Sequence, residues 1–152
     1  MATAADVLAV AMKEIGTVEQ SGNRQKYGKA YGMDGVYWCM QFVWWCFQQV
    51  DKTLFMDGGK TASCGELMRW AQAHGQWVTK GYRPGDVLIY DFPGTAYKTD
   101  HCGICESGSG QYVTAIEGNT SNGNAGSQSN GDGVYRRKRK LSLVLGAYRP
   151  KY

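Results

Sequence analysis

The chain has 152 residues, 43% of them hydrophobic, and it carries five tryptophans. This length and composition suit one core, so we expect a single domain over residues 1–152. Seventeen basic and thirteen acidic residues give a net charge of +4, which does not choose among polyanionic partners such as nucleic acid, a membrane surface or an anionic cell wall.

The termini, apolar runs and cysteines narrow the class of protein. The longest apolar stretch, Phe42 to Phe47, is far shorter than the ~20 residues of a membrane-spanning helix, so no membrane insertion is expected. The N-terminus does not read as a secretory signal, and we expect synthesis in a cytoplasm. Five cysteines without a repeated spacing argue against a disulfide framework and predict free thiols.

Three helices are predicted in the first half of the chain. Thr3 and Asp6 resemble a helix cap, and apolar residues follow at helical spacing until Gly16. Residues 21–35 are polar and punctuated by glycine. A second helix runs from Cys39 to about residue 50, and a third follows the capping box Ser63-Cys64-Gly65-Glu66 and ends at residue 75.

After residue 75 the apolar pattern alternates, which predicts strands. Helices followed by strands predict an α+β fold, with N-terminal helices packed on a mostly antiparallel six-stranded sheet. Residues 119–133 are almost entirely small and polar, so we expect a mobile loop there. The six predicted strands span residues 77–79, 86–92, 101–106, 112–117, 134–139 and 143–149.

Cys39 is the candidate nucleophile because it lies where a loop turns into an apolar helix. Unpaired N–H groups and the helix dipole favour a thiolate at that position. A free cysteine titrates near ~8.5, whereas a helix N-terminus or an imidazolium lowers that pKa to roughly 3.5 to 7.5. A thiolate nucleophile also needs a base.

His101 is the candidate base, since it begins one strand while Glu117 and Asn119 end the next strand along the chain. Glu117 would fix the tautomer of the imidazole and stabilise its charged form. His74, at the end of the third helix, is expected to be only a cation near a helix C-terminus. Each residue alone has a structural explanation, and it is their combination that predicts catalysis.

Several stretches, in order along nearly the whole chain, resemble the cysteine, histidine-dependent amidohydrolase/peptidase (CHAP) domains of phage endolysins and bacterial wall hydrolases. The matching stretches are Glu14-Ile15-Gly16-Thr17, Lys26-Tyr27-Gly28, Tyr31-Gly32-Met33-Asp34-Gly35, Trp38-Cys39, Gly85-Asp86-Val87, Asp100-His101-Cys102-Gly103-Ile104 and Glu117-Gly118-Asn119-Thr120-Ser121.

The resemblance implies a papain-like fold and a peptidoglycan hydrolase that cuts an amide bond, either between muramic acid and L-alanine or within the stem or cross-bridge peptide. It implies that Cys39 attacks, that His101 is the base, and that Glu117 and Asn119 orient or polarise. Tyr31, Tyr37 and Trp38 lead up to the thiol and are expected to bind substrate, although ordinary packing of the tyrosines is the alternative.

No cofactor and no metal are expected. Some members of this family bind calcium through acidic residues on both sides of the nucleophile, but here Asp34 stands nearly alone and Gln41 occupies the later position. We further expect a monomer that reaches the wall by phage-type lysis, or by specialised secretion if it is an antibacterial effector.

Two other classes are weighed. A zinc module is prompted by His101, Cys102 and Cys105, but alternate residues of a strand face opposite ways, so Cys102 and Cys105 could not readily share an ion. A nucleic-acid binder is prompted by the basic run 136–140, but a strand would divide these charges between two faces, which suits an exposed edge better. We therefore expect no nucleic-acid partner.

Overall fold

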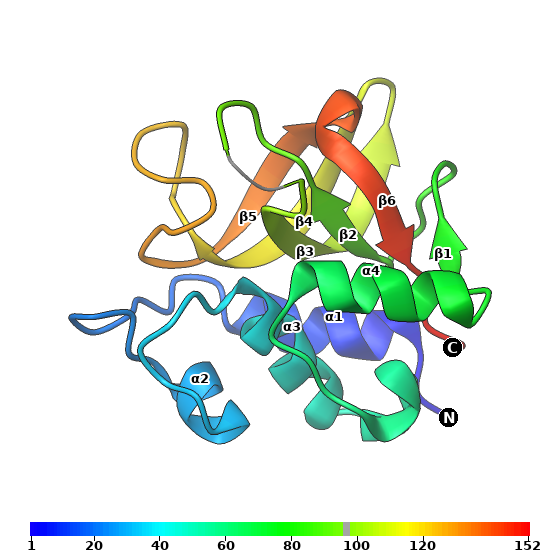
Figure 1. Cartoon of the computed structure of the whole chain (residues 1–152), viewed down its shortest axis with the longest axis horizontal. Coiled ribbons are helices and arrows are strands. Elements are labelled where there is room, and N and C mark those ends of the chain that lie inside the picture. The colour runs from blue at the N-terminus through cyan, green and yellow to red at the C-terminus, as the bar shows by residue number, and fades with distance from the viewer. Residues whose placement is uncertain (96–97) are drawn as a thin grey trace.

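The computed structural model describes residues 1–95 and 98–152, and Figure 1 shows helices below one face of a curved sheet. None of the helices in this described part of the chain is long and apolar enough to span a membrane. The helices are α1 (Ala4–Lys13), α2 (Lys26–Tyr31), α3 (Cys39–Gln48) and α4 (Cys64–Ala73), with short 3-10 turns at Lys52–Leu54, Met56–Gly58 and Leu141–Leu143.

The three predicted helices are confirmed, and their caps explain where they begin. At α1 the Thr3 side chain accepts a hydrogen bond from the Asp6 N–H while the Asp6 carboxylate accepts one from the Thr3 N–H, a complete capping box. At α4 the Ser63 hydroxyl accepts from the N–H of Glu66 at 3.1 Å. These side chains satisfy backbone donors that a helix leaves unpaired.

The short helix α2 is not predicted by the sequence pattern. Its six residues are too few for an apolar repeat, and a glycine lies within them. It forms because Gln25 accepts from the N–H of Gly28 at 2.7 Å and because Tyr27 is fully buried. Gly32, with φ of 94°, ends it in the left-handed conformation that glycine tolerates.

All six predicted strands are confirmed, although their ends differ by a few residues from the predicted ones. The strand order is β1-β6-β2-β3-β4-β5, and every neighbouring pair is antiparallel. The antiparallel α+β class is therefore confirmed. The strands are β1 (Trp77–Val78), β2 (Val87–Tyr90), β3 (His101–Ser109), β4 (Tyr112–Thr120), β5 (Gly133–Lys140) and β6 (Val144–Tyr148).

Strand β4 runs further than predicted, so the loop after it begins at residue 121. Hydrogen bonds hold this loop in place, since it has few apolar side chains to pack. The Ser121 hydroxyl donates to the Ser127 carbonyl at 2.6 Å, and Gln128 donates to the Gly123 carbonyl at 3.1 Å. The Thr120 hydroxyl at the end of β4 donates to the Gln128 carbonyl at 2.8 Å. The loop is thereby tied to the strand end.

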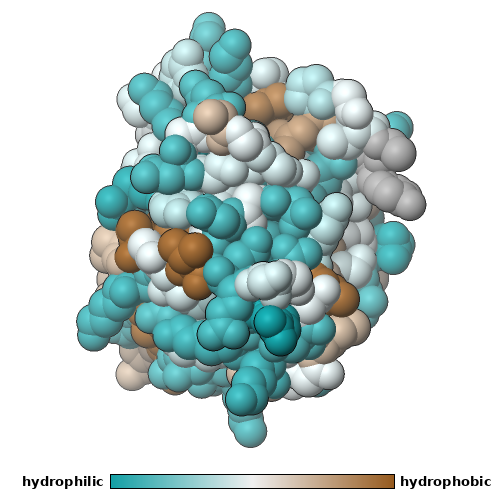
Figure 2. Space-filling view, turned by 90° about the vertical axis from the view of Figure 1, so that its left-hand side faces the viewer, coloured by the Kyte–Doolittle hydropathy of each residue, from teal (hydrophilic) through white to brown (hydrophobic). Residues whose placement is uncertain are grey.

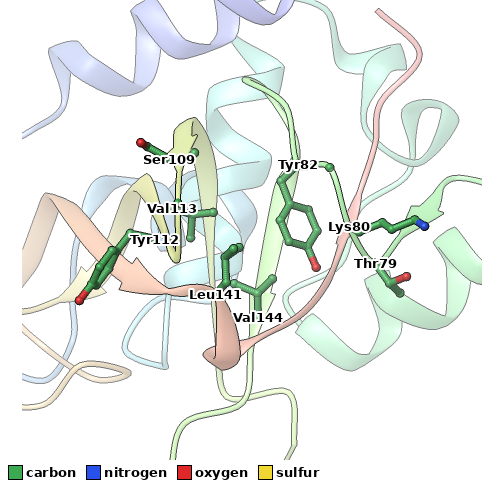
Figure 3. Close-up of a pocket in the computed structure, with 11 residues that line it drawn as sticks. Thr79, Lys80, Tyr82, Ser109, Tyr112, Val113, Leu141 and Val144 are labelled. Carbon is green, nitrogen blue, oxygen red and sulfur yellow. The ribbon is translucent and has the colours of Figure 1, made fainter.

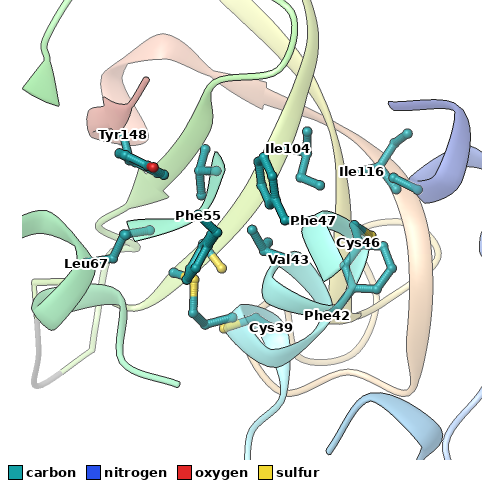
Figure 4. Close-up of a cluster of buried hydrophobic side chains, with 14 of the residues drawn as sticks. Cys39, Phe42, Val43, Cys46, Phe47, Phe55, Leu67, Ile104, Ile116 and Tyr148 are labelled. Carbon is teal, nitrogen blue, oxygen red and sulfur yellow. The ribbon is translucent and has the colours of Figure 1, made fainter. Parts of the chain in front are cut away.

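The sheet separates two apolar clusters. The larger cluster lies between the sheet and the helices and includes Phe42 and Val43 of α3 and Ile104 of β3 (Figure 4). Cys102 belongs to this helix-side cluster, whereas Cys105 belongs to the smaller cluster on the opposite side. The prediction that these two cysteines face opposite ways is therefore confirmed.

Helix α3 crosses β4 very closely at Gly118. A Cβ added at Gly118 would lie 2.6 Å from Phe42 Cβ and 2.9 Å from a ring carbon of Trp38. Side-chain atoms of a packed core at such distances cannot remain where they are. The glycine therefore sets how near the start of α3, and with it Cys39, lies to the sheet.

We predict that Gly118→Ala lowers the free energy of unfolding by about 1–3 kcal/mol, because the added methyl group overpacks this contact. Gly108→Ala in β3 is the matched control, since its Cβ would meet only Val113 Cγ1 at 3.7 Å and the Tyr112 carbonyl at 3.8 Å. Urea denaturation of both variants measures the difference. Equal stabilities would contradict the close crossing.

Candidate active site

Cys39 is the first residue of α3, as predicted, and its side chain is nearly buried, with 7% of its surface exposed. Trp38 occupies the N-cap position without a side-chain cap hydrogen bond. The backbone N–H of Cys39 has no partner within the helix because it belongs to the first turn. The thiol and an unpaired N–H donor therefore lie at the same helix end.

His101 is the first residue of β3, and the antiparallel partner strand β4 brings Glu117 to it. The imidazole Nε2 lies 2.9 Å from Glu117 Oε1, and both side chains are fully buried. Among the described residues, His101 Nδ1 has no hydrogen-bond partner. With Nε2 held by the carboxylate, Nδ1 is the nitrogen left to exchange a proton with a neighbour.

Arg139 holds the other side of Glu117. Its Nη2 donates to Glu117 Oε1 at 2.6 Å and its Nε donates to Oε2 at 3.1 Å. Further donations go to Gln128 Oε1 at 2.8 Å and to the Thr120 hydroxyl at 3.1 Å. A carboxylate buried between a guanidinium and an imidazole is fixed in position and kept ionised.

The basic run 136–140 thus has two faces, as its alternation predicts. Strand β5 is an edge strand, and Arg136, Lys138 and Lys140 are exposed. The expectation of an edge role alone is incomplete, because Arg137 and Arg139 point inward and are 7% and 6% exposed. The role of Arg139 was missed because the sequence shows neither its burial nor its partner Glu117.

Two further thiols surround Cys39. Cys64, the first residue of α4, has its Sγ 4.0 Å from the Cys39 Sγ, and Cys102 follows His101 on β3. The neighbouring thiols of Cys102 and Cys64 and the charge of His101 lower the pKa of Cys39 well below its usual range despite burial. The two thiols were not predicted as members of the site.

The pKa values of His101 and Glu117 shift in opposite directions. Burial alone lowers the pKa of His101, but the charge of Glu117 and the Cys39 sulfur outweigh it and raise that pKa to about 9. Burial alone raises the pKa of Glu117, but His101 and Arg139 outweigh it and lower that pKa. These directions favour a thiolate–imidazolium pair of Cys39 and His101 beside an ionised Glu117.

Asn119 lies in the same strand as Glu117, fully buried, with a positive φ of 56°. Its amide donates to the Ser129 carbonyl at 3.4 Å, and its carbonyl oxygen has no hydrogen-bond partner among the described residues. Its backbone carbonyl accepts from the Gly131 N–H at 2.9 Å. In this structure Asn119 therefore ties the 121–132 loop to β4.

The three expected substrate-binding aromatics differ in exposure. Tyr37 is 61% exposed, and Tyr31 is half-buried against Trp44. Trp38 is fully buried, stacks on Tyr27 and donates from Nε1 to Glu19 at 2.8 Å. Its ring supports the start of α3 and offers no surface to a ligand, whereas the two tyrosines do.

Asp34 and Gln41, the two positions at which the resemblance would place calcium ligands, are engaged in other contacts. Asp34 Oδ1 accepts from the backbone N–H groups of Gln25 and Gly35, each at 3.0 Å. Gln41 donates to the Met33 carbonyl at 2.9 Å, and its own buried oxygen has no partner in the described part of the chain. One carboxylate that already accepts two backbone hydrogen bonds and one amide oxygen are too few ligands for calcium, which takes six to eight oxygen ligands.

One pocket of the structure is separate from these residues. A cavity of about 380 Å³ opens between the β1–β2 connection, the β3–β4 turn and the residues around Leu141, with Tyr82, Val113 and Val144 among its walls (Figure 3). None of Cys39, His101 and Glu117 lines it. The surface that carries α2 and the 121–132 loop is mainly hydrophilic (Figure 2).

Comparisons with known proteins agree with the fold described above. The family model described as the CHAP domain matches residues 30–119. The wild-type endolysin LysIME-EF1 has a similar structure, with a TM-score of 0.60 and 16% identity, over 100% of this chain and 66% of that one. Ly7917 is similar over 98% of this chain and 63% of its own, with a TM-score of 0.61 and 16% identity.

At such identities the structural likeness shows the fold, and the chain spans just under two thirds of the length of these two proteins. A search of curated protein sequences finds no significant match. The family match contains Cys39, His101 and Glu117, and Asn119 is its last residue.

We predict that Cys39 reacts with iodoacetamide at a rate that is already maximal near neutral pH, whereas an ordinary thiol becomes reactive only around its pKa of ~8.5. The thiolate–imidazolium pair of Cys39 and His101 exists at pH values above the lowered pKa of Cys39 and below the pKa of His101, which is about 9. The pair is lost when the pH rises through 9 or falls through the pKa of Cys39. Peptide mapping by mass spectrometry follows Cys39 alone.

Glu117→Gln provides the comparison, because it removes the charge that raises the pKa of His101. The imidazolium then deprotonates at lower pH, and the onset of Cys39 alkylation moves to higher pH. A wild-type rate that climbs steeply only between about pH 8 and 9 would show that Cys39 is an ordinary thiol.

Proposed function

This chain belongs to the CHAP domain family, and on that premise we propose that it is a peptidoglycan hydrolase in which Cys39, His101 and Glu117 cleave an amide bond. Residues 1–152 serve as the catalytic domain. The observation that carries the proposal is the buried Glu117–His101 contact of 2.9 Å, which leaves Nδ1 without a hydrogen-bond partner in the described part of the chain, beside a thiol of lowered pKa at a helix N-terminus.

The first half of the reaction acylates the enzyme. The Cys39 thiolate attacks the carbonyl carbon of the amide, and the carbonyl oxygen becomes an oxyanion. The unpaired N–H of Cys39 stabilises that oxyanion, an interaction of a kind worth roughly 100- to 1,000-fold in turnover. His101 then gives its Nδ1 proton to the departing nitrogen, the C–N bond breaks, and a thioester remains.

The second half regenerates the thiolate. Neutral His101 takes a proton from water at Nδ1, and the resulting hydroxide attacks the thioester carbon. When the C–S bond breaks, the product leaves as a carboxylic acid and Cys39 returns to the thiolate. Throughout, the carboxylate of Glu117 accepts from Nε2–H, which keeps the reactive lone pair on Nδ1.

Glu117 itself is held by Arg139, which acts as a positioning residue. Asn119 is likewise proposed to act by position, since it holds the loop beside the strand end. Tyr31 and Tyr37 are the proposed substrate contacts, because both expose ring surface on the chain segment that leads to Cys39.

Peptidoglycan is the proposed substrate because the family and the mainly hydrophilic surface in Figure 2 suit a polar sugar–peptide polymer. One of the two similar solved structures is the endolysin LysIME-EF1, which supports a bacteriolytic role. The bond is either the amide between muramic acid and L-alanine or a peptide bond of the stem or cross-bridge. Action at the cell wall, by a monomer, is part of this proposal.

We predict that the purified protein lowers the turbidity of a suspension of susceptible bacterial walls, and that Cys39→Ala abolishes this activity. His101→Ala is expected to reduce the rate at least about 100-fold, because general acid–base catalysis is lost. Glu117→Ala is expected to suppress it as well. Circular dichroism confirms that each variant is folded.

Two matched variants serve as controls. His74→Ala removes the other histidine, which is exposed and stacks on Trp70 at the end of α4. Cys105→Ala removes a thiol on the opposite side of the sheet. Both should lyse walls at the wild-type rate, and undiminished lysis by Cys39→Ala would refute the mechanism. Mass spectrometry of released fragments then identifies the bond, because an amidase frees the L-alanine amino group from muramic acid.

We also predict that the chelator EDTA leaves the lytic rate unchanged within about twofold, because the donors around Asp34 and Gln41 do not suit calcium. The measurement compares turbidity curves of wild-type protein with EDTA and with added calcium. Lysis that stops with EDTA and returns with calcium would contradict the fit argued above.

A further inference from the structure

Three cysteine sulfurs meet at one point of the molecule. The Sγ atoms of Cys39, Cys64 and Cys102 all lie within 4.8 Å of one another. They come from the first residue of α3, the first residue of α4 and the second residue of β3. Nothing in their spacing of 25 and 38 residues along the chain resembles a zinc motif, and only the fold brings them together.

The separation of the sulfurs suits a shared metal ion. Two thiolates bound to one zinc ion at ~2.3 Å, with tetrahedral angles, have sulfurs about 3.8 Å apart. The Cys39 and Cys64 sulfurs are 4.0 Å apart, and the third sulfur lies within 4.8 Å of both. Small rotations of the side chains would bring all three within bonding distance of a single ion.

The surroundings favour a soft cation over other occupants. All three side chains are buried, with 7%, 7% and 0% of their surface exposed, and no carboxylate belongs to the cluster. Thiolate sulfur prefers zinc and similar thiophilic ions over calcium or magnesium. Cys39 and Cys64 retain a little exposed surface, which provides a way in from solvent.

A cysteine binds zinc as a thiolate, so the thiol protons of the cluster pass to solvent when the ion binds. Three protein ligands leave the fourth position of a zinc ion open.

We propose that Cys39, Cys64 and Cys102 form a binding site for a thiophilic divalent cation such as zinc, and that occupation of this site inhibits the enzyme by engaging the nucleophilic sulfur. Binding stands independently of the proposed function, whereas inhibition rests on it. The proposed site does not mean that the enzyme needs a metal, because the reaction proposed above proceeds with the cluster free of metal.

The test of binding uses the wild-type chain, stripped of metal and kept reduced with a phosphine so that no disulfide forms. Titration with zinc against a chromophoric chelator should show one equivalent bound per chain. Titration with cobalt should give the near-ultraviolet thiolate-to-cobalt charge-transfer band, which reports sulfur ligands directly. No bound zinc and no such band would overturn the proposal without any variant.

Variants then assign the ligands. Cys64→Ser and Cys102→Ser should each weaken zinc binding by at least about 10-fold. Loss of an outer-shell partner of a metal ligand typically costs about 10- to 100-fold in metal affinity, and loss of the ligand itself should cost at least the lower of these values. Cys105→Ala, on the opposite side of the sheet, and His74→Ala, at the surface, should bind zinc as the wild type does. Wild-type affinity in both serine variants would also overturn the site.

Inhibition is measured separately in the turbidity assay. Zinc at saturating concentration should abolish lysis by the wild type, and EDTA should restore it. A chain that binds zinc through these cysteines but never lyses walls would leave the metal site standing and refute the proposed function. A chain that lyses walls at the same rate with and without saturating zinc would refute the inhibitory site alone.

Discussion

The contact on which the site depends is the buried carboxylate of Glu117 between His101 and Arg139. Its two oxygens accept one imidazole and two guanidinium hydrogen bonds at 2.6 to 3.1 Å, and none of the three groups has access to water beyond a few per cent of its surface. Removing one partner of such a buried pair typically costs ~3–5 kcal/mol, because the remaining charge is left unpaired. Glu117 therefore links the stability of the sheet to the orientation of the imidazole.

The charges in this region cancel in either protonation state. Thiolate, imidazolium, carboxylate and guanidinium sum to zero, and so do thiol, neutral imidazole, carboxylate and guanidinium. A proton can therefore pass between Cys39 and His101 without creating net charge in a buried site, where net charge is costly. Two structural features make this possible: the antiparallel order β3-β4-β5, which places His101, Glu117 and Arg139 on adjacent strands, and the close crossing at Gly118, which brings α3 to β4.

Much of this arrangement follows from local sequence, and the remainder does not. The capped helices, the six strands and the pairing of His101 with Glu117 were predicted because caps, alternation and neighbouring strands are visible in the sequence. Helix α2 was missed because its six residues show no period. The placing of Cys64 beside Cys39 depends on how α4 packs, and no pattern within either helix contains that information. Arg139 was predictable only as one of five basic residues until its strand register was known.

The choice of thiols around Cys39 has a chemical consequence of its own. A nucleophilic thiolate needs donors to stabilise it, and hydroxyl or amide groups could supply them. Here two thiols, those of Cys64 and Cys102, lie within 4.8 Å of the Cys39 sulfur, and thiols are weak donors that fill small apolar spaces well. Once the first sulfur is ionised, however, the same three atoms form a set of soft ligands. If Cys39 is the nucleophile, as proposed, the same arrangement makes its sulfur both reactive and sensitive to thiophilic ions.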